Sequence, residues 1–269
     1  MSPKGSRDHI FHRVLRERWR TISHGDGVYL FDTDGNRYLD ACGGVHVVSI
    51  GHGVKEVVEA IQKQASRVSF TYNQFLNWSQ VDLAAKIANM SPPGLSRVFF
   101  VSGGSEATES AVKIARKYHL ETGNPQKTKV IARWQSWHGN TLGALSLSGR
   151  ESWRADYVPY LLNFPHIPSP YCYRCPLGKT YPDCEIACAE ELERAIHREG
   201  SDSIAAFIAE PIVGTSAAGI LSDHPGYLRS SRYSHDRRRG SNGFRKDGSK
   251  FWHRSLERGA GHHGHREGP

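Results

Sequence analysis

Residues 98–109 read VFFVSGGSEATE, an apolar run followed directly by a paired-glycine turn and a polar, alanine-containing segment. Gly103 and Gly104 allow a sharp turn that brings backbone N–H groups close to an anion, and the unpaired N–H groups of a first helical turn point to the same place. Alanines recur downstream at helical spacing. The stretch therefore predicts a strand, a turn and a helix, with an anion held at the N–H groups of Gly104 and Ser105. A glycine turn of this kind also serves plain chain reversal, so this feature alone leaves both roles open.

Apolar periodicity predicts an α/β fold. Its spacing favours helices near 53–66, 78–90, 106–121 and 186–199, and strands near 28–31, 97–101, 129–133 and 204–209. Strands that alternate with helices form mostly parallel sheets covered on both faces. Asp34-Gly35 separates two short apolar runs, which predicts a hairpin turn.

Composition favours a soluble, cytoplasmic protein. The 269 residues are 38% hydrophobic, enough for one large or two small domains. The sequence contains no run of 18 apolar residues, and residues 1–20 lack the apolar core of a secretory signal. We therefore expect no membrane partner.

Three side chains outside the glycine turn are candidates for a site. Trp137 is suited to stacking on a flat heteroaromatic ring, or else to filling a core. His138 is suited to donating a hydrogen bond to a ligand, or to a purely structural contact. Glu210 follows the predicted strand 204–209, and ligands of open α/β sheets sit at the carboxyl ends of strands. Its alternative is a turn-capping role before Pro211.

Four cysteines form a second cluster within an insertion at about residues 168–189, namely Cys172, Cys175, Cys184 and Cys188. Four thiolates at such spacing suit a zinc or iron–sulfur centre, whereas disulfides are disfavoured in a reducing compartment. Cys184 and Cys188 lie one helical turn apart, but the first pair is free to face elsewhere. We therefore expect a packed loop without a metal.

Several further motifs agree with the glycine turn, in order along the chain. Together they resemble the class III (ornithine/4-aminobutyrate type) pyridoxal-phosphate aminotransferases through about residue 228. The motifs are GDGVYLFD (25–32), DGNRYLD (34–40), GHG (51–53), WHGNT (137–141) and AEPIVG (209–214).

This resemblance implies a fold type I transferase that binds pyridoxal 5′-phosphate and passes an amino group from an amino donor to a keto acid. Residues 1–50 would form the N-terminal segment and hairpin of the small domain, and residues 51–228 part of the cofactor-binding large domain. The intact family member would be a homodimer. The implied cofactor-binding residues are Gly103, Gly104, Ser105, Trp137, His138 and Glu210, with Gly103 standing where serine is common. Substrate-pocket residues are expected near His46, Tyr72 and Trp78.

Residues 229–269 have a different composition. They hold eleven Lys/Arg and four Asp/Glu, a net charge of +7 out of +8 for the whole chain, and they lack apolar periodicity. On composition they form a disordered basic tail. One interpretation is an arm that binds nucleic acid.

We favour another interpretation, in which no nucleic acid is bound and the tail results from a frameshift or a wrong splice junction. Back-translated and read one nucleotide later, residues 237–248 permit ADEVQTGFGKTG, the next motif of the family. The same frame permits GID at 252–254, IMV at 262–264 and AKG from residue 266, the setting of the family's cofactor-binding lysine.

As written, the chain lacks that lysine and the aspartate that pairs with the pyridinium nitrogen, so no catalytic residue is assigned. We therefore expect this 269-residue product to be an incomplete and inactive aminotransferase. An alternative role is that of a catalytically dead fragment that pairs with a full-length partner.

Overall fold

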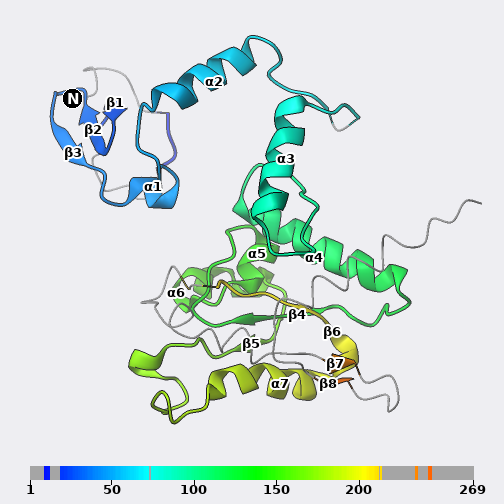
Figure 1. Cartoon of the computed structure of the whole chain (residues 1–269). Coiled ribbons are helices and arrows are strands. Elements are labelled where there is room, and N and C mark those ends of the chain that lie inside the picture. Colours follow the sequence, from blue (N-terminus) through cyan, green and yellow to red (C-terminus); the bar gives the residue numbers. More distant parts are fainter. Residues whose placement is uncertain are drawn as a thin grey trace, which may run out of the picture. The chain divides into compact units, whose positions relative to one another are not determined.

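The computed structural model describes residues 9–12, 19–72, 74–211, 213, 234–235 and 242–243 (Figure 1). The chain divides into two compact units, residues 1–81 and 82–269. The predicted boundary near residue 50 lies inside the first unit and stays a prediction.

The first unit contains a three-stranded antiparallel sheet in which Leu30 pairs with Tyr38 across the predicted hairpin. The Asp32 carboxylate, which is buried, closes the hairpin by accepting hydrogen bonds from the backbone N–H groups of Asp34 (3.0 Å) and Asn36 (2.8 Å). It also accepts one from the Tyr38 hydroxyl at 2.6 Å. The hairpin prediction is therefore confirmed. The strands are β1 (Ile22–Asp26), β2 (Tyr29–Asp32) and β3 (Arg37–Leu39).

These bonds make hairpin stability depend on pH. Hydrogen bonds from Tyr38 and Asn36 lower the pKa of Asp32 from its ordinary value of 3.8 to about 2. Because the folded pKa is the lower one, the stabilisation is complete above 3.8 and is lost as pH falls through about 2. We expect the Asp32→Asn variant to lose less stability than the parent between these two pH values. Carboxyl NMR titration checks the assignment, and a midpoint near 4 would contradict it.

A glycine contact holds the loop around His52 against the hairpin. The backbone N–H of His52 donates to the Gly27 carbonyl at 2.8 Å, and the Gly27 N–H donates to the His52 carbonyl at 3.0 Å. A Cβ on Gly25 would lie 2.6 Å from the His52 side chain, so only glycine fits there. The glycines of the GDG and GHG motifs thus have a structural role in the first unit.

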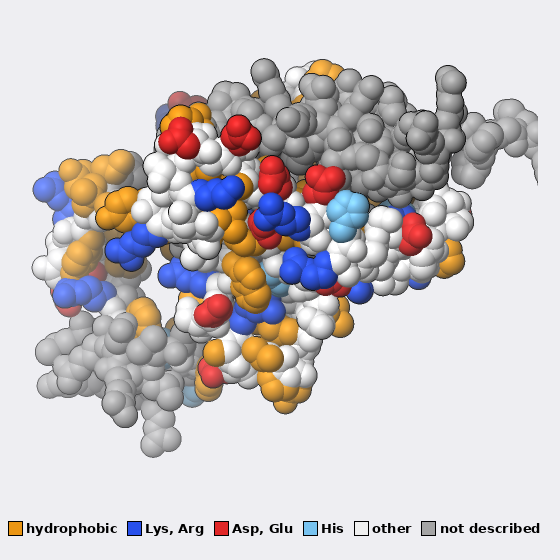
Figure 2. All heavy atoms as spheres, turned by 90° about the horizontal axis from the view of Figure 1, so that it is seen from below, with side chains coloured by type: hydrophobic (Ala, Val, Ile, Leu, Met, Phe, Trp, Pro, Cys, Tyr) orange, Lys and Arg blue, Asp and Glu red, His pale blue; other side chains and the backbone are white. Residues whose placement is uncertain are grey.

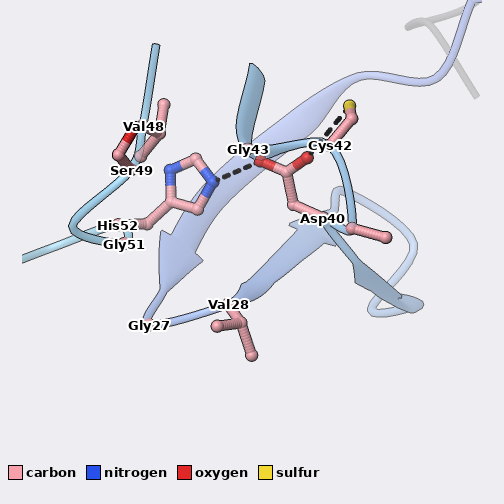
Figure 3. A pocket seen from close by; sticks show the side chains of 10 residues that line it. Gly27, Val28, Asp40, Cys42, Gly43, Val48, Ser49, Gly51 and His52 are labelled. Carbon is pink, nitrogen blue, oxygen red and sulfur yellow. Dashed lines mark hydrogen bonds and ion pairs between the residues drawn. The ribbon is translucent and has the colours of Figure 1, made fainter. Parts of the chain in front are cut away.

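Beside this contact lies a small hollow of about 290 Å³, bordered by the turn at Gly27 and the loops 40–43 and 48–52 (Figure 3). On its wall His52 Nε2 and Asp40 Oδ2 lie 3.0 Å apart, and Asp40 Oδ1 accepts from the Gly44 N–H at 3.3 Å. The hydrogen bond with His52 lowers the pKa of Asp40. This carboxylate serves mainly to join two loops.

Helices follow the sheet of the first unit. α1 (Gly43–His46) is a short turn, and α2 (Lys55–Ala65) confirms the helix expected near 53–66. α3 (Trp78–Met90) begins in the first unit and ends in the second, as the apolar spacing indicated.

The second unit is built on a parallel sheet of order β5-β4-β6. The strands alternate with helices, as predicted. The remaining elements are α4 (Gly104–Glu121), β4 (Lys129–Arg133), α5 (Leu142–Leu147), α6 (Glu151–Arg154), η1 (Ala155–Tyr160), β5 (His166–Ile167), η2 (Cys172–Arg174), α7 (Ala187–Glu199), η3 (Ser201–Ser203) and β6 (Ile204–Phe207).

Helices cover both faces of this sheet, with α4 and α5 on one side and α7 on the other (Figure 1). Side chains of β4 alternate between the two layers. Val130 and Ala132 pack with Ala115 of α4 and Leu147 of α5, whereas Ile131 packs with α7. The fully buried Ile131 and Leu147 mark the two core layers.

The outer face of α7 is charged. Arg194 pairs with Glu190 at 3.2 Å and with Glu191 at 2.6 Å, one turn earlier on the helix. Acidic and basic side chains are intermixed on the face shown in Figure 2. Charged side chains of both signs are typical of the solvent-facing side of an amphipathic helix.

The prediction of a strand at residues 97–101 is wrong. Among the described residues this segment pairs with no strand, and Phe99 is 70% exposed. Apolar, β-branched and aromatic residues form a strand only beside a partner, and the described parallel sheet ends at β5 and β6. The strand expected at 204–209 is real but ends at Phe207.

The basic tail is described at only two places, β7 (Ser234–His235) and β8 (Asn242–Gly243), which pair antiparallel. The rest of residues 229–269 lies outside the described residues, so their predicted disorder stays a prediction. Within the described part of the chain, no helix is long and apolar enough to cross a membrane.

Candidate cofactor site

The glycine turn leads into the start of α4. The helix begins at Gly104 after an extended Gly103 (φ −166°, ψ 172°), which provides no side-chain cap, and Glu106 Oε2 of the first turn accepts from the Ser102 N–H at 2.7 Å. A Cβ on either glycine would meet no atom within 4 Å, so both border open space. The first N–H groups of an α-helix have no partner within the helix, and its dipole favours an anion there. The predicted turn and helix are confirmed, and the turn presents donors to a free volume.

One face at the start of α4 binds a second turn, residues 137–141. Ser105 Oγ donates to Asn140 Oδ1 at 3.1 Å and accepts from the Asn140 backbone N–H at 3.1 Å. Thr108 Oγ1 donates to the His138 carbonyl at 2.8 Å. The two turns are thereby joined at the open end of the helix.

The second turn depends on a glycine. Gly139 has a φ of +136°, and a Cβ there would lie 2.8 Å from Ser105 Cα and 2.9 Å from Ala144 Cβ. Any larger residue would push the turn away from α4. The glycine of the WHGNT motif is thus required by close backbone approach.

Glu210 connects the end of the sheet to this turn. Its Oε1 accepts a hydrogen bond from the Trp137 backbone N–H at 2.6 Å, across 73 residues of sequence. Glu210 follows β6 by three residues, at the carboxyl end of a parallel strand. The start of α4, the Trp137 turn and the end of β6 therefore meet in one region.

The Trp137 side chain remains partly exposed. Its ring packs edge-on against Trp153, with centroids 4.7 Å apart and planes at 85°, and 36% of the residue is exposed. The Arg150 guanidinium lies 4.4 Å from the Trp153 ring centroid. This packing fixes the indole while leaving part of it open to a flat ligand.

His138 is half-buried. Among the described residues its Nε2 has no hydrogen-bond partner. Burial lowers the pKa of His138, and the nearby Glu210 opposes that shift. Burial therefore favours the neutral imidazole, whose Nε2 is itself buried.

The six predicted site residues thus fall in one region. Ser105, Trp137, His138 and Glu210 are linked by the bonds above, and the two glycines precede Ser105 directly. Sequence reasoning missed Thr108, Glu109, Asn140 and Thr141, which hold the site together. Polar residues at positions 105, 108 and 109 lie on one face of a helix, and this spacing is the sequence signal that could have indicated part of this set.

The predicted substrate-pocket residues belong to the first unit. Tyr72 and Trp78 are exposed, and the side chain of His46 lies outside the described residues. Their role in a substrate pocket stays a prediction.

The four cysteines of the insertion are free thiols. Burial raises the pKa of Cys172, and it raises the pKa of Cys188 to about 11. In the part of the chain that the structure describes, no three His, Cys, Asp or Glu side chains are arranged to hold a metal ion. The raised pKa values keep the Cys172 and Cys188 thiols protonated and weakly reactive.

One test of the site concerns Glu210. We expect Glu210→Ala to cost about 1.5–3 kcal/mol of stability, because the Trp137 N–H loses a charged acceptor. Glu210→Gln keeps an oxygen acceptor and should cost less. Urea unfolding followed by tryptophan fluorescence checks this, with the exposed Glu190→Gln as control. Equal stability of Glu210→Ala and the control would show that the bond is unimportant.

A parallel sheet covered by helices, with an open helix start beside a fixed tryptophan, defines an α/β protein with a candidate anion site. The sequence profile "Aminotransferase class-III" matches residues 12–236. The chain therefore belongs to the class III aminotransferase family, whose members depend on pyridoxal phosphate.

Individual relatives of the chain are aminotransferases too. The uncharacterized aminotransferase YodT of Bacillus subtilis is 41% identical over 79% of this chain and 48% of its own length. The putrescine–pyruvate aminotransferase of Pseudomonas aeruginosa is 36% identical over 80% of this chain and 49% of its own. The chain spans about half the length of the curated relatives that it matches.

Solved structures show the same fold. An (S)-enantioselective omega-transaminase from Thermomicrobium roseum superposes with a TM-score of 0.70 at 39% identity, covering 74% of this chain and 45% of that one. A PLP-bound amine transaminase from an uncultivated Pseudomonas species gives 0.72 at 33% identity, covering 78% and 49%. The predicted fold type I architecture is confirmed.

Proposed function

We propose that this chain supplies the phosphate- and ring-binding part of a pyridoxal-phosphate aminotransferase. The observation that carries the proposal is the bonded network joining the open start of α4 to the Trp137 turn. It brings a helix N-terminus, a hydroxyl and a flat aromatic ring into one region.

The residues present fit the cofactor. Its phosphate would bind to the N–H groups of Gly104 and Ser105, where the helix dipole adds attraction, while the Ser105 hydroxyl stays bonded to Asn140. Gly103 and Gly104 keep the approach free of side-chain atoms, because a Cβ at either position would occupy the open space described above.

The exposed part of Trp137 would cover the flat ring of the cofactor. Glu210 holds the backbone of Trp137, and His138, with its buried and unpaired Nε2 among the described residues, stays a proposed cofactor contact. When bound, pyridoxal phosphate withdraws electrons from the substrate carbon that bears the amino group. The residues of this chain bind and orient it.

For the intact protein we propose an amino donor and a keto acid as substrates, a homodimer as the assembly and the cytoplasm as the location. The relatives differ in substrate, as the names putrescine–pyruvate and diaminobutyrate–2-oxoglutarate transaminase indicate. The donor is therefore decided by residues beyond the shared cofactor region.

The lysine and the aspartate of the family are absent from the sequence as written. We propose that the coding DNA beyond about residue 228 carries them one nucleotide out of frame. Within residues 237–248 the shifted frame permits both the DEVQTG motif and its aspartate. Sequencing the gene and its transcript tests this, and a verified transcript with stop codons in the second frame would refute it.

Cofactor binding is the direct test of the proposed function. Pyridoxamine 5′-phosphate is a suitable probe because it carries the phosphate and ring without the reactive aldehyde. We expect it to quench the fluorescence of Trp137 in the purified chain, and Trp137→Leu to remove that part of the quenching. Quenching that is unchanged in Trp137→Leu would place the ring elsewhere.

A further inference from the structure

We infer that Glu109 is a positioning residue, which holds the Trp137 turn in register with the start of α4. The ligand that benefits is the phosphate-bearing cofactor, so this part of the inference rests on the proposed function. Glu109 acts through its neighbours and has no need to touch the cofactor.

Glu109 joins two helices. It lies on the second turn of α4, and its Oε1 accepts hydrogen bonds from Thr141 Oγ1 at 2.6 Å and from the Ala144 backbone N–H at 3.2 Å. Thr141 occupies the N-cap of α5, but its side chain makes no capping bond to that helix. The carboxylate from α4 therefore provides the cap that α5 lacks.

The carboxylate fits closely against α5. A Cβ on Gly143 would lie 2.5 Å from Glu109 Oε2 and 2.6 Å from Oε1, so the glycine leaves room for the charge. A negative group at the N-terminus of a helix is also favoured by the helix dipole. Both effects fix the position of α5 relative to α4.

Residues 137–141 lead directly into α5, so the placement of α5 sets the placement of the turn. Ser105, Thr108 and Glu109 occupy positions i, i+3 and i+4 of α4, and all three bind this turn or the start of α5. Glu109 anchors the end nearest α5, whereas Ser105 lies at the cofactor end. If the bonds of Glu109 to Thr141 and Ala144 are broken, the turn 137–141 is no longer held at its α5 end, and the Ser105–Asn140 contact is weakened.

The test compares three variants of the full 269-residue chain. Glu109→Gln removes the charge at nearly constant shape, and Thr141→Val removes one donor while keeping the side-chain volume. Glu121→Gln is the matched control, since Glu121 is exposed on the last turn of the same helix and forms a solvent-facing i,i+4 ion pair with Lys117.

Two readouts separate the positioning role from general stability. Amide hydrogen exchange of Ala144 should become about 10-fold faster in Glu109→Gln, because both bonds lose their charged acceptor, and about 3-fold faster in Thr141→Val, because one of the two bonds is removed. Binding of pyridoxamine 5′-phosphate should weaken by the same factors, with unchanged far-ultraviolet circular dichroism. Glu121→Gln should match the parent in both.

The outcomes for exchange and for binding test the role of Glu109 and the proposed function separately. Parent-like exchange at Ala144 in both Glu109→Gln and Thr141→Val would overturn the inference. If the parent binds no pyridoxamine 5′-phosphate, the proposed function fails, whereas faster exchange still establishes Glu109 as the anchor of the turn. If Glu109→Gln fails to fold, Thr141→Val decides by the same measurements.

Discussion

The 269-residue chain will show no transaminase turnover, whereas the protein read one nucleotide later from about residue 229 will transfer amino groups. The reason is chemical. The residues of α4 and the Trp137 turn would hold a cofactor only by noncovalent contacts, but the reaction needs an amine nucleophile and a carboxylate at the ring nitrogen. The family motifs that carry this lysine and this aspartate are permitted in the shifted frame of residues 237–269 and do not occur in the sequence as written.

Borohydride reduction in the presence of pyridoxal phosphate, followed by peptide mass spectrometry, provides the measurement. The corrected protein should carry one phosphopyridoxyl-lysine at the position encoded across Glu267 and Gly268. A corrected protein with alanine in place of that lysine is the control and should be inactive. A specific adduct on any lysine of the present chain, together with turnover, would contradict the account.

Gly139→Ala should strongly damage the site. Its Cβ would lie 2.8 Å from Ser105 Cα, which belongs to the backbone of α4 and has no flexible way to withdraw. We expect a loss of about 2–4 kcal/mol of stability, the sum of strain at positive φ and a displaced turn. Binding of pyridoxamine 5′-phosphate should fall at least about 10-fold, since 1.4 kcal/mol is a factor of ten.

Gly123→Ala is the matched control. Gly123 also has a positive φ, +76°, but a Cβ there would meet nothing within 4 Å. It should therefore cost only the backbone strain, about 1 kcal/mol, and leave binding unchanged. Urea unfolding of both variants gives the difference. Equal losses would show that the close approach at Gly139 carries no energy.

Local sequence signals predicted much of this fold. α2, α3, α4 and α7 follow from apolar spacing, and the hairpin follows from Asp34-Gly35 between short apolar runs. The parallel sheet follows from strands that alternate with helices. In each case the pattern that determines the element lies within the element itself.

Elements that depend on distant partners were not predictable. Residues 97–101 have strand-forming side chains, yet among the described residues no strand lies beside them to complete a ladder. β5 has only two residues, His166 and Ile167, too few to show a period. The start of α5 is stabilised by a carboxylate 35 residues earlier in the chain, which no local rule indicates.

The candidate site likewise contains residues that local patterns indicate and contacts that they do not indicate. Gly103, Gly104, Ser105 and Trp137 were recognisable because turn and aromatic motifs are local. The contacts of Glu210 with Trp137, and of Ser105 with Asn140, join segments 73 and 35 residues apart. Only the folded sheet brings them together.

The central claim is that the start of α4 binds the phosphate of a pyridoxal-type cofactor, and a comparison of two ligands tests it most directly. Pyridoxamine 5′-phosphate and pyridoxamine share the ring and differ only in the phosphate. Titrated into the purified chain with tryptophan fluorescence as readout, the phosphorylated ligand should bind at least about 5-fold more tightly, because the helix N-terminus contributes roughly a kilocalorie or more per mole. Equal affinity of the two ligands would contradict the account.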